Sequence, residues 1–557
     1  MNDKTSKKNC TKNKFFNSIL LAGIASLTLM VSCSKKIDDA YLNPNAQVIE
    51  PIESILPSVI GGFSAYYSSA GTGYGLQNDG ILLGRYIQYW GSQTAAELYG
   101  EMGGTGASDN TGSVWAAVYY GHGQNVNKII LWGTQQQKWD YVGVAWAIRA
   151  WGWLQLTNQY GDAILKEAFN TSLQQFHYDT QPEFYDSCRA ICFRALSFLN
   201  RTDGNVSPAN LAIGDKYFYN GDVSKWKKFV YAILARSYND LTNKAIYTSN
   251  GYADSAIKYA NLAMTSNIDN ATCKFAGGNT SALNSYYGPF RGNVGTIRQA
   301  AYICNLMTGL NSAFPGVADP RAPYMLRENT NGTYKGFTPW LGSAGLVTND
   351  YPQNFWGNAN ATSTAAPAVD NSRYVFQNTG EYPMMTASEM QFILAESYLR
   401  KGNNAAALAA YTNAISLNFD MLTTNYTNNI PAAAVITPVS KAAYLANPII
   451  VPPASSLTLT DIMLQKYIAL YGWGVHETWT DMRRYHYTDL DPVTGKQVYA
   501  DFTPPSGIYL NATNNGKLVY RCRPRYNSEY LYDVPELTRI GAEAPDYNTL
   551  EMWYTQK

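Results

Sequence analysis

The sequence has few charged residues and very few histidines. Asp, Glu, Lys and Arg make up 15% of its 557 residues, whereas about 25% is usual in soluble domains. Only four residues are histidine, which leaves little material for a histidine-based catalytic or metal site. His476-Glu477 begins like the HExxH motif of zinc proteases, but residue 480 is Thr and the second histidine is missing. We therefore expect no metal site and no cofactor.

The chain also lacks a motif that would identify catalytic residues. Glycoside cleavage usually needs two carboxylates that flank the scissile bond, and no short motif nominates such a pair. The Gly-rich stretches 71–75 and 103–106 lack the Lys of a phosphate-binding loop. The sequence therefore predicts a protein that is not an enzyme.

A strong excess of either charge is absent as well. The formal net charge is +1, and residues 1–32 contain five Lys and one Asp, so the remainder carries −3. Proteins hold nucleic acid with clustered Lys and Arg. We therefore expect no nucleic-acid partner.

Long apolar runs are limited to one, near the N-terminus. It extends from Ile19 to Val31, which is shorter than the ~20 residues that span a bilayer. Lysines precede it and Ser32-Cys33 ends it, an order that is typical of a bacterial lipoprotein signal. We predict a signal peptide over 1–32, a lipid on Cys33, a tether over 33–51 and a folded domain over 52–557. An ordinary signal peptide that happens to end near a cysteine is the alternative.

Aromatic residues, by contrast, are abundant, with 44 Tyr, 13 Trp and 19 Phe. Tyr and Trp tolerate partial exposure because each ring carries a polar group. The surplus favours a surface that binds through aromatics, although a thick aromatic core is the alternative. Five cysteines follow Cys33 without framework spacing, so disulfides are not expected to stabilise a chain of this length.

The clearest internal pattern lies at 391–415. Small and large residues alternate there at the spacing of a tetratricopeptide helix pair, on Leu394, Ala395, Tyr398, Gly402, Ala407, Tyr411 and Ala414. Weaker patterns predict pairs over 115–133 with 138–159 and 224–242 with 252–265, and helices over 182–200 and 460–472. We expect a mostly α fold of tetratricopeptide-like helix pairs. Long irregular excursions, at 267–387 and 420–458, are expected to carry the binding function.

Several segments together resemble the SusD/RagB family, in order along almost the whole chain. They are Asn43-Pro44-Asn45, Leu156–Ala168 with Tyr160-Gly161-Asp162, Gly221-Asp222 with Trp226, Asp319-Pro320-Arg321, Met385–Glu389 with Phe392–Glu396, Gln465–Leu470 with Asp481–Arg484, and Arg523–Tyr526 with Glu529. The resemblance implies a lipoprotein of the bacterial outer membrane that faces outward. It also implies that the protein captures glycans and passes them to a SusC-like TonB-dependent β-barrel transporter.

Candidate ligand contacts follow from chemistry, because sugar rings stack on aromatic faces while amides and Arg bind hydroxyls. Aromatic and polar residues interleave in three places. These are Arg85, Tyr89, Trp90 and Gln93, then Tyr287 and Arg291 around a Gly-Pro turn, then Trp340 and Trp356 in the first excursion. Core packing or contact with the transporter is the alternative for each.

Two other functions remain open at this point. The same machinery could carry oligopeptides, because a low charge disfavours only highly ionic peptides. The repeats could also serve as a tetratricopeptide interaction module that holds a protein and no small ligand.

The lipid anchor is directly testable. Cys33→Ala removes the thiol that would carry the lipid, so the variant should leave the membrane fraction while remaining folded. Membrane fractionation with a circular dichroism spectrum measures both properties. Retention of the variant on membranes would rule out Cys33 as the anchor.

Overall fold

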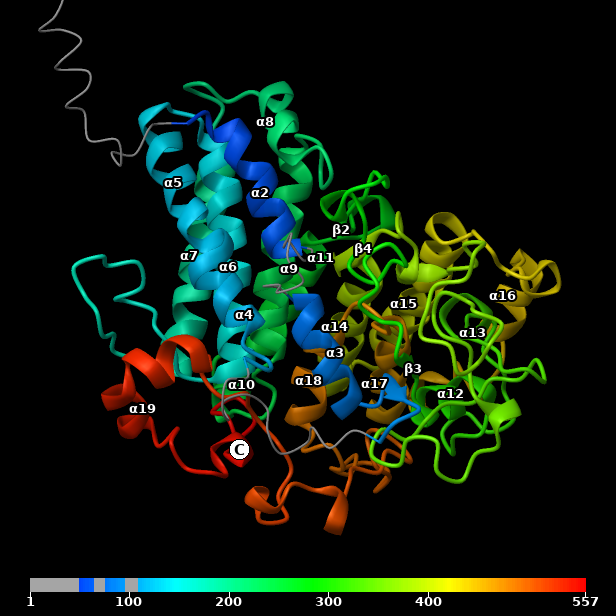
Figure 1. Ribbon diagram of the computed structural model, residues 1–557. Coiled ribbons are helices and arrows are strands. Elements are labelled where there is room, and N and C mark those ends of the chain that lie inside the picture. Colours follow the sequence, from blue (N-terminus) through cyan, green and yellow to red (C-terminus); the bar gives the residue numbers. More distant parts are fainter. Residues whose placement is uncertain (1–49, 65–75, 96–108) are drawn as a thin grey trace, which may run out of the picture. The chain divides into compact units, whose positions relative to one another are not determined.

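Helices account for most of the regular structure in the computed structural model, which describes residues 50–64, 76–95 and 109–557 (Figure 1). The predicted mostly α fold is confirmed. The predicted signal peptide, Cys33 and the tether as far as residue 49 lie outside the described residues. Within those residues, no helix combines the length and the apolar character that a membrane span requires.

The first half of the chain forms a layer of long helices around α6 (Trp139–Tyr160). All residues of α6 except Trp146 are buried, as expected for a helix that neighbours surround. These neighbours are α2 (Ile52–Ser64), α5 (His122–Gln135), α7 (Gln181–Leu199) and α9 (Val223–Asn239), which lie together in Figure 1. The helices predicted at 115–133, 138–159 and 182–200 correspond to this layer.

The predicted repeat at 391–415 forms α14 (Ala387–Arg400) and α15 (Asn404–Asn425), which pack against each other. Thr386 caps α14 by accepting a hydrogen bond from the Glu389 amide, and Asn403 caps α15 in the same way. Gly402 between them has φ +72°, a conformation that favours glycine. The helix α15 extends six residues, 420–425, into the segment predicted as the second excursion.

The remaining helices complete the α framework. The other predicted pair, at 224–242 with 252–265, is α9 with α11 (Tyr252–Leu262), and the helix predicted at 460–472 is α17 (Leu459–Ala469). Shorter helices are α3 (Leu76–Tyr86), α4 (Ser113–Ala116), α8 (Pro208–Asp215), α10 (Ala245–Ser249), α12 (Ala301–Thr308), α13 (Ala322–Met325), α16 (Pro438–Leu445), α18 (Val475–Arg484) and α19 (Val534–Ile540).

The first excursion contains three of the four strands, which form two small antiparallel sheets in the described residues. β1 (Trp90–Ser92) pairs with β3 (Ile297–Gln299), and β2 (Ala271–Cys273) pairs with β4 (Tyr382–Met385). The second sheet joins the two ends of the predicted excursion 267–387. The excursion is therefore a closed loop whose ends meet at the start of α14.

Much of the tyrosine surplus lies in the core. Buried tyrosines on the excursions and helices donate their hydroxyl hydrogen to main-chain carbonyls far away in the sequence. These bonds join Tyr89 to Tyr467, Tyr302 to Ala500, Tyr374 to Tyr471, Tyr382 to Trp473 and Tyr411 to Ile450. For these residues the aromatic core, and not a binding surface, explains the composition. The five cysteines after Cys33 are buried, and none of them forms a disulfide within the described part of the chain.

A buried ionic network joins four helices. Arg484 of α18 donates to both carboxylate oxygens of Glu396 on α14, at 2.9 and 3.0 Å, and to Asp481 at 2.5 Å. Lys466 of α17 lies 2.7 Å from the same Asp481. Burial alone would raise the pKa of Glu396, but the charges of Arg484 and Arg400 hold that pKa well below its usual value. Glu396 is therefore a carboxylate at neutral pH.

The network continues to α9 through Arg236. Its guanidinium contacts Glu389 of α14 at 2.6 Å and Glu477 of α18 at 2.9 Å. No side chain among the seven that form the core of the network is more than 3% exposed. Removing one partner would leave an uncompensated charge in the interior.

The network predicts a strong effect of Arg484→Ala. The substitution leaves Glu396 and Asp481 buried without their main partner, so the free energy of unfolding should fall by about 3–5 kcal/mol. Urea unfolding followed by circular dichroism measures this change.

Lys401→Ala is the matched control, because Lys401 pairs with Asp254 on the surface, where the two side chains are 41% and 67% exposed. Its cost should stay below about 1 kcal/mol. Equal costs for the two substitutions would show that the buried network is not a main source of stability.

Candidate functional site

Four of the eight predicted ligand contacts are buried. Tyr89, Trp90, Tyr287 and Trp356 are at most 2% exposed. The Trp90 indole donates to the carbonyl of Gly80 at 2.9 Å, and the Trp356 indole donates to the carbonyl of Tyr287 at 2.8 Å. The Trp90 and Tyr287 rings meet edge to face at 6.2 Å. In this conformation these rings support the loops and present no open face to a ligand.

Trp340 and Gln93 lie on neighbouring loops. Trp340 is half-buried in a tight turn that a hydrogen bond from the Gly342 amide to the Thr338 carbonyl closes. The next residue, Ser343, donates its amide hydrogen to the carbonyl of Gln93 at 2.9 Å. The side chain of Gln93 is exposed beside β1. The structure thus brings together two residues that are almost 250 positions apart. Arg85 is half-buried in the last turn of α3.

Arg291 belongs to a different loop, which folds against the segment 277–284. Its guanidinium donates to the carbonyl of Ser281 at 3.0 Å and lies 5.8 Å from the ring centre of Tyr286. The amide of Phe290 donates to the side-chain oxygen of Asn378 at 2.9 Å. Phe290 itself is 47% exposed. The predicted Gly-Pro turn is therefore part of a larger arrangement that includes Asn378.

That arrangement encloses a polar cavity of about 450 Å³, which both excursions line. The first excursion contributes two segments and the second contributes one. The lining residues are Gly277, Gly278, Asn284, Asp370, Gln377, Asn378, Thr379, Asn428 and Asn429. Five of these nine carry side-chain amides, which both donate and accept hydrogen bonds. Such a lining suits a ligand with many hydroxyl or amide groups.

Local backbone geometry shapes the cavity walls. Gly278 has φ +129°, a conformation that is essentially restricted to glycine. Asn429 has φ +61°, a left-handed conformation that Asn adopts more readily than most residues. Its side chain donates to the carbonyls of Asp370 and Ser372, at 3.2 and 2.8 Å. These bonds join the second excursion to the first at the cavity.

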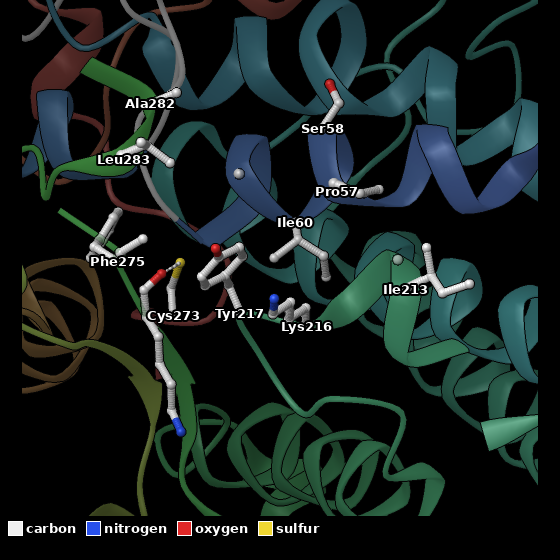
Figure 2. Close-up of a pocket in the computed structure, with 14 residues that line it drawn as sticks. Pro57, Ser58, Ile60, Ile213, Lys216, Tyr217, Cys273, Phe275, Ala282 and Leu283 are labelled. Atoms are coloured by element: carbon white, nitrogen blue, oxygen red, sulfur yellow. Dashed lines mark hydrogen bonds between the residues drawn. The ribbon is translucent and has the colours of Figure 1, made fainter. Parts of the chain in front are cut away.

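An apolar cavity of about 350 Å³ borders on the same loop (Figure 2). It lies between α2, the end of α8 and the segment 273–283. Ile60, Ile213, Tyr217, Phe275 and Leu283 line it, together with Lys216 and smaller residues. The segment 273–284 thus contributes to a polar cavity and an apolar one.

Neither cavity holds an arrangement typical of glycoside cleavage. Among the described residues, Asp370 is the only carboxylate that lines the polar cavity, and none lines the apolar cavity. Burial raises the pKa of Glu477 above its usual value, against the lowering effects of Arg236 and Lys466. Glu477, however, lies in the buried ionic network. Among the described residues, no group of three His, Cys, Asp or Glu side chains could hold a metal ion.

The sequence did not identify the amide residues of the cavity. Asn284, Asn378 and Asn428 come from segments that lie about 50 to 145 positions apart, and only folding places them together. The available signal was compositional, because the excursions are rich in Asn and Gly. That signal marks loops in general and selects no residue.

Comparisons with known proteins agree with this architecture. Among solved structures, similar folds include a chitin-binding protein (18% identity, TM-score 0.64, covering 91% of this chain and 100% of that one). A SusD/RagB family protein of Bacteroides thetaiotaomicron is similar as well (21%, 0.60, 91% and 99%). So is a chitin-binding SusD homologue of Flavobacterium johnsoniae (16%, 0.59, 90% and 98%).

A search of curated protein sequences finds no match. A SusD-like family model, described as starch-binding and associating with the outer membrane, matches residues 65–506. This match covers well over half of the chain, and the similar solved structures share its fold. The chain therefore belongs to the SusD-like family.

Proposed function

We propose that the protein is a lipoprotein of the outer cell surface that captures glycans and passes them to a SusC-like TonB-dependent transporter. The amide-lined cavity where the two excursions meet is the observation that carries this proposal. Sugars present many hydroxyl groups, and side-chain amides can pair with them as donors and as acceptors. The family description and the names of two similar structures, which are chitin-binding proteins, support a glycan ligand.

Binding without catalysis fits the same geometry. Glycoside cleavage usually needs two carboxylates about 5–10 Å apart, and the polar cavity has one. In our proposal the protein holds its ligand and releases it unchanged, and it needs no cofactor. The lipid on Cys33 would keep it at the membrane.

Trp340 is the proposed aromatic contact. Of the three tryptophans predicted as ligand contacts, Trp340 is the one that is only half-buried. The exposed side chain of Gln93 lies on the adjoining loop. Arg85 and Arg291 are half-buried and could contribute donors to hydroxyl groups. Tyr89, Trp90, Tyr287 and Trp356 would act as support behind this surface.

A binding screen tests the function. The mature chain from Ser34 onward would be titrated by calorimetry with plant, microbial and host glycans, and with a casein digest. Binding of a glycan without release of smaller products is the expected result. A binding signal with the casein digest and with no glycan would favour oligopeptides as the ligand. If neither the glycans nor the casein digest bind, the result would favour a repeat module that binds only proteins.

Trp340→Ala should weaken glycan binding about tenfold while leaving the melting temperature nearly unchanged, because the residue contributes a partly exposed ring. Trp146→Ala is the control, since Trp146 is also half-buried but lies on α6, away from the excursions. It should leave binding intact. Trp90→Ala should instead cost about 3–5 kcal/mol of stability. Unchanged affinity in Trp340→Ala would remove that residue from the site.

A further inference from the structure

Asn284 stands out in the wall of the polar cavity. The residue is 1% exposed, and its side-chain oxygen has no hydrogen-bond partner among the described residues. Buried polar atoms are almost always paired, and an unpaired one calls for an explanation. This oxygen has almost no accessible surface, but Asn284 belongs to the cavity wall. A small displacement of that wall would let a ligand in the cavity supply the missing partner.

The orientation of the Asn284 amide is fixed by its other atoms. The side-chain nitrogen donates to the carbonyls of Gly278 and Thr280, at 3.0 and 2.7 Å. Both of its hydrogens are therefore used. Rotating the amide by half a turn would place its oxygen against these two carbonyl oxygens, which repel it. The unpaired atom is thus an acceptor, and its missing partner must be a donor such as a hydroxyl or an amide N–H.

The charges around the cavity restrict the ligand further. Within the part of the chain that the structure describes, Asp370 is the only ionisable residue in the lining, which includes no Lys or Arg. One oxygen of Asp370 accepts hydrogen bonds from the amide and hydroxyl of Ser372, at 2.9 and 2.5 Å, so the carboxylate is held in place. Arg327 lies within electrostatic range of Asp370 but does not line the cavity. An anionic sugar entering the cavity would therefore meet the Asp370 carboxylate directly, and the guanidinium only through the cavity wall.

We infer that the polar cavity binds a neutral glycan unit, with Asn284 as the buried acceptor for a ligand hydroxyl or amide N–H and Asp370 as the group that rejects anionic sugars. This inference rests on the proposed function and adds the location and the chemical class of the ligand. The exposed amides of Asn428 and Asn429 lie on the opposite excursion. The Asn429 nitrogen already donates to the carbonyls of Asp370 and Ser372, so Asn429 offers its oxygen as an acceptor. Asn428 offers an acceptor and one remaining donor hydrogen.

The test compares neutral and acidic ligands on the same variants. The neutral probes are oligosaccharides of chitin, starch and xylan, and methyl-esterified oligogalacturonate. The acidic probes are unesterified oligogalacturonate and alginate oligomers. The two forms of oligogalacturonate share one backbone and differ in charge. The native protein should bind at least one neutral probe and should prefer it to the acidic probes.

Three variants assign this binding to the cavity. Asp370→Asn keeps the oxygen that Ser372 contacts but removes the charge, so affinity for acidic probes should rise about tenfold while neutral affinity stays constant. Asn284→Ala should lower neutral affinity about tenfold. Because Asn284→Ala could also loosen the loop, Asn428→Ala provides a second test at an exposed side chain and should lower neutral affinity in the same direction.

Asp186→Asn is the control for charge, because Asp186 lies on α7 with its side chain 81% exposed. It should change neither preference. Neutral binding that survives Asn284→Ala and Asn428→Ala unchanged would overturn the cavity assignment and leave glycan capture standing. Binding of acidic probes alone would overturn the neutral class. If no glycan probe binds, both the proposed function and the present inference would be overturned.

Discussion

The buried ionic network between α9, α14, α17 and α18 is the interaction on which the rest of the structure depends. Arg484, Arg236 and Lys466 are each shared between two carboxylates from different turns or helices. Each charge in the interior is therefore compensated only when the four helices hold their relative positions. Such a network penalises alternative packings, because a shifted helix would leave a charge unpaired. The excursions need this framework because they contain little regular structure of their own.

Hydrogen bonds from buried side chains then fasten the excursions to the framework. Arg321 of the first excursion donates to Asn418 on α15 and to Gln465 on α17, at 2.9 and 2.6 Å. Tyr374 and Tyr382 donate to carbonyls just beyond α17. A tyrosine fills apolar space with its ring and satisfies a buried carbonyl with its hydroxyl. These contacts explain how segments with few strands or helices keep a defined cavity.

The sequence predicted the helical framework because local signals repeat there. The tetratricopeptide spacing around Tyr411 and the helix cap at Thr386 are each visible within a few residues. The site was harder to predict. Trp90 is a residue type that commonly contacts ligands, yet the rings of Tyr287, Phe355 and Tyr471, about 200 to 380 positions away in the sequence, pack against it. Asn284 resembles many other loop residues, and its unpaired oxygen exists only because residues 277–284 fold around its nitrogen.

The few charged residues of the sequence are distributed unevenly between the interior of the protein and the cavity. A considerable part of the limited charge is used inside the protein, where buried Arg and Lys pair with carboxylates, mostly on other helices. The excursions, in contrast, line their cavity with amides and a single carboxylate. Amides pair well with hydroxyl groups and do not attract counter-ions, so they lose less hydration energy than charged groups when a ligand covers them. The protein thus places much of its charge in the interior and surrounds the cavity mainly with neutral polar groups.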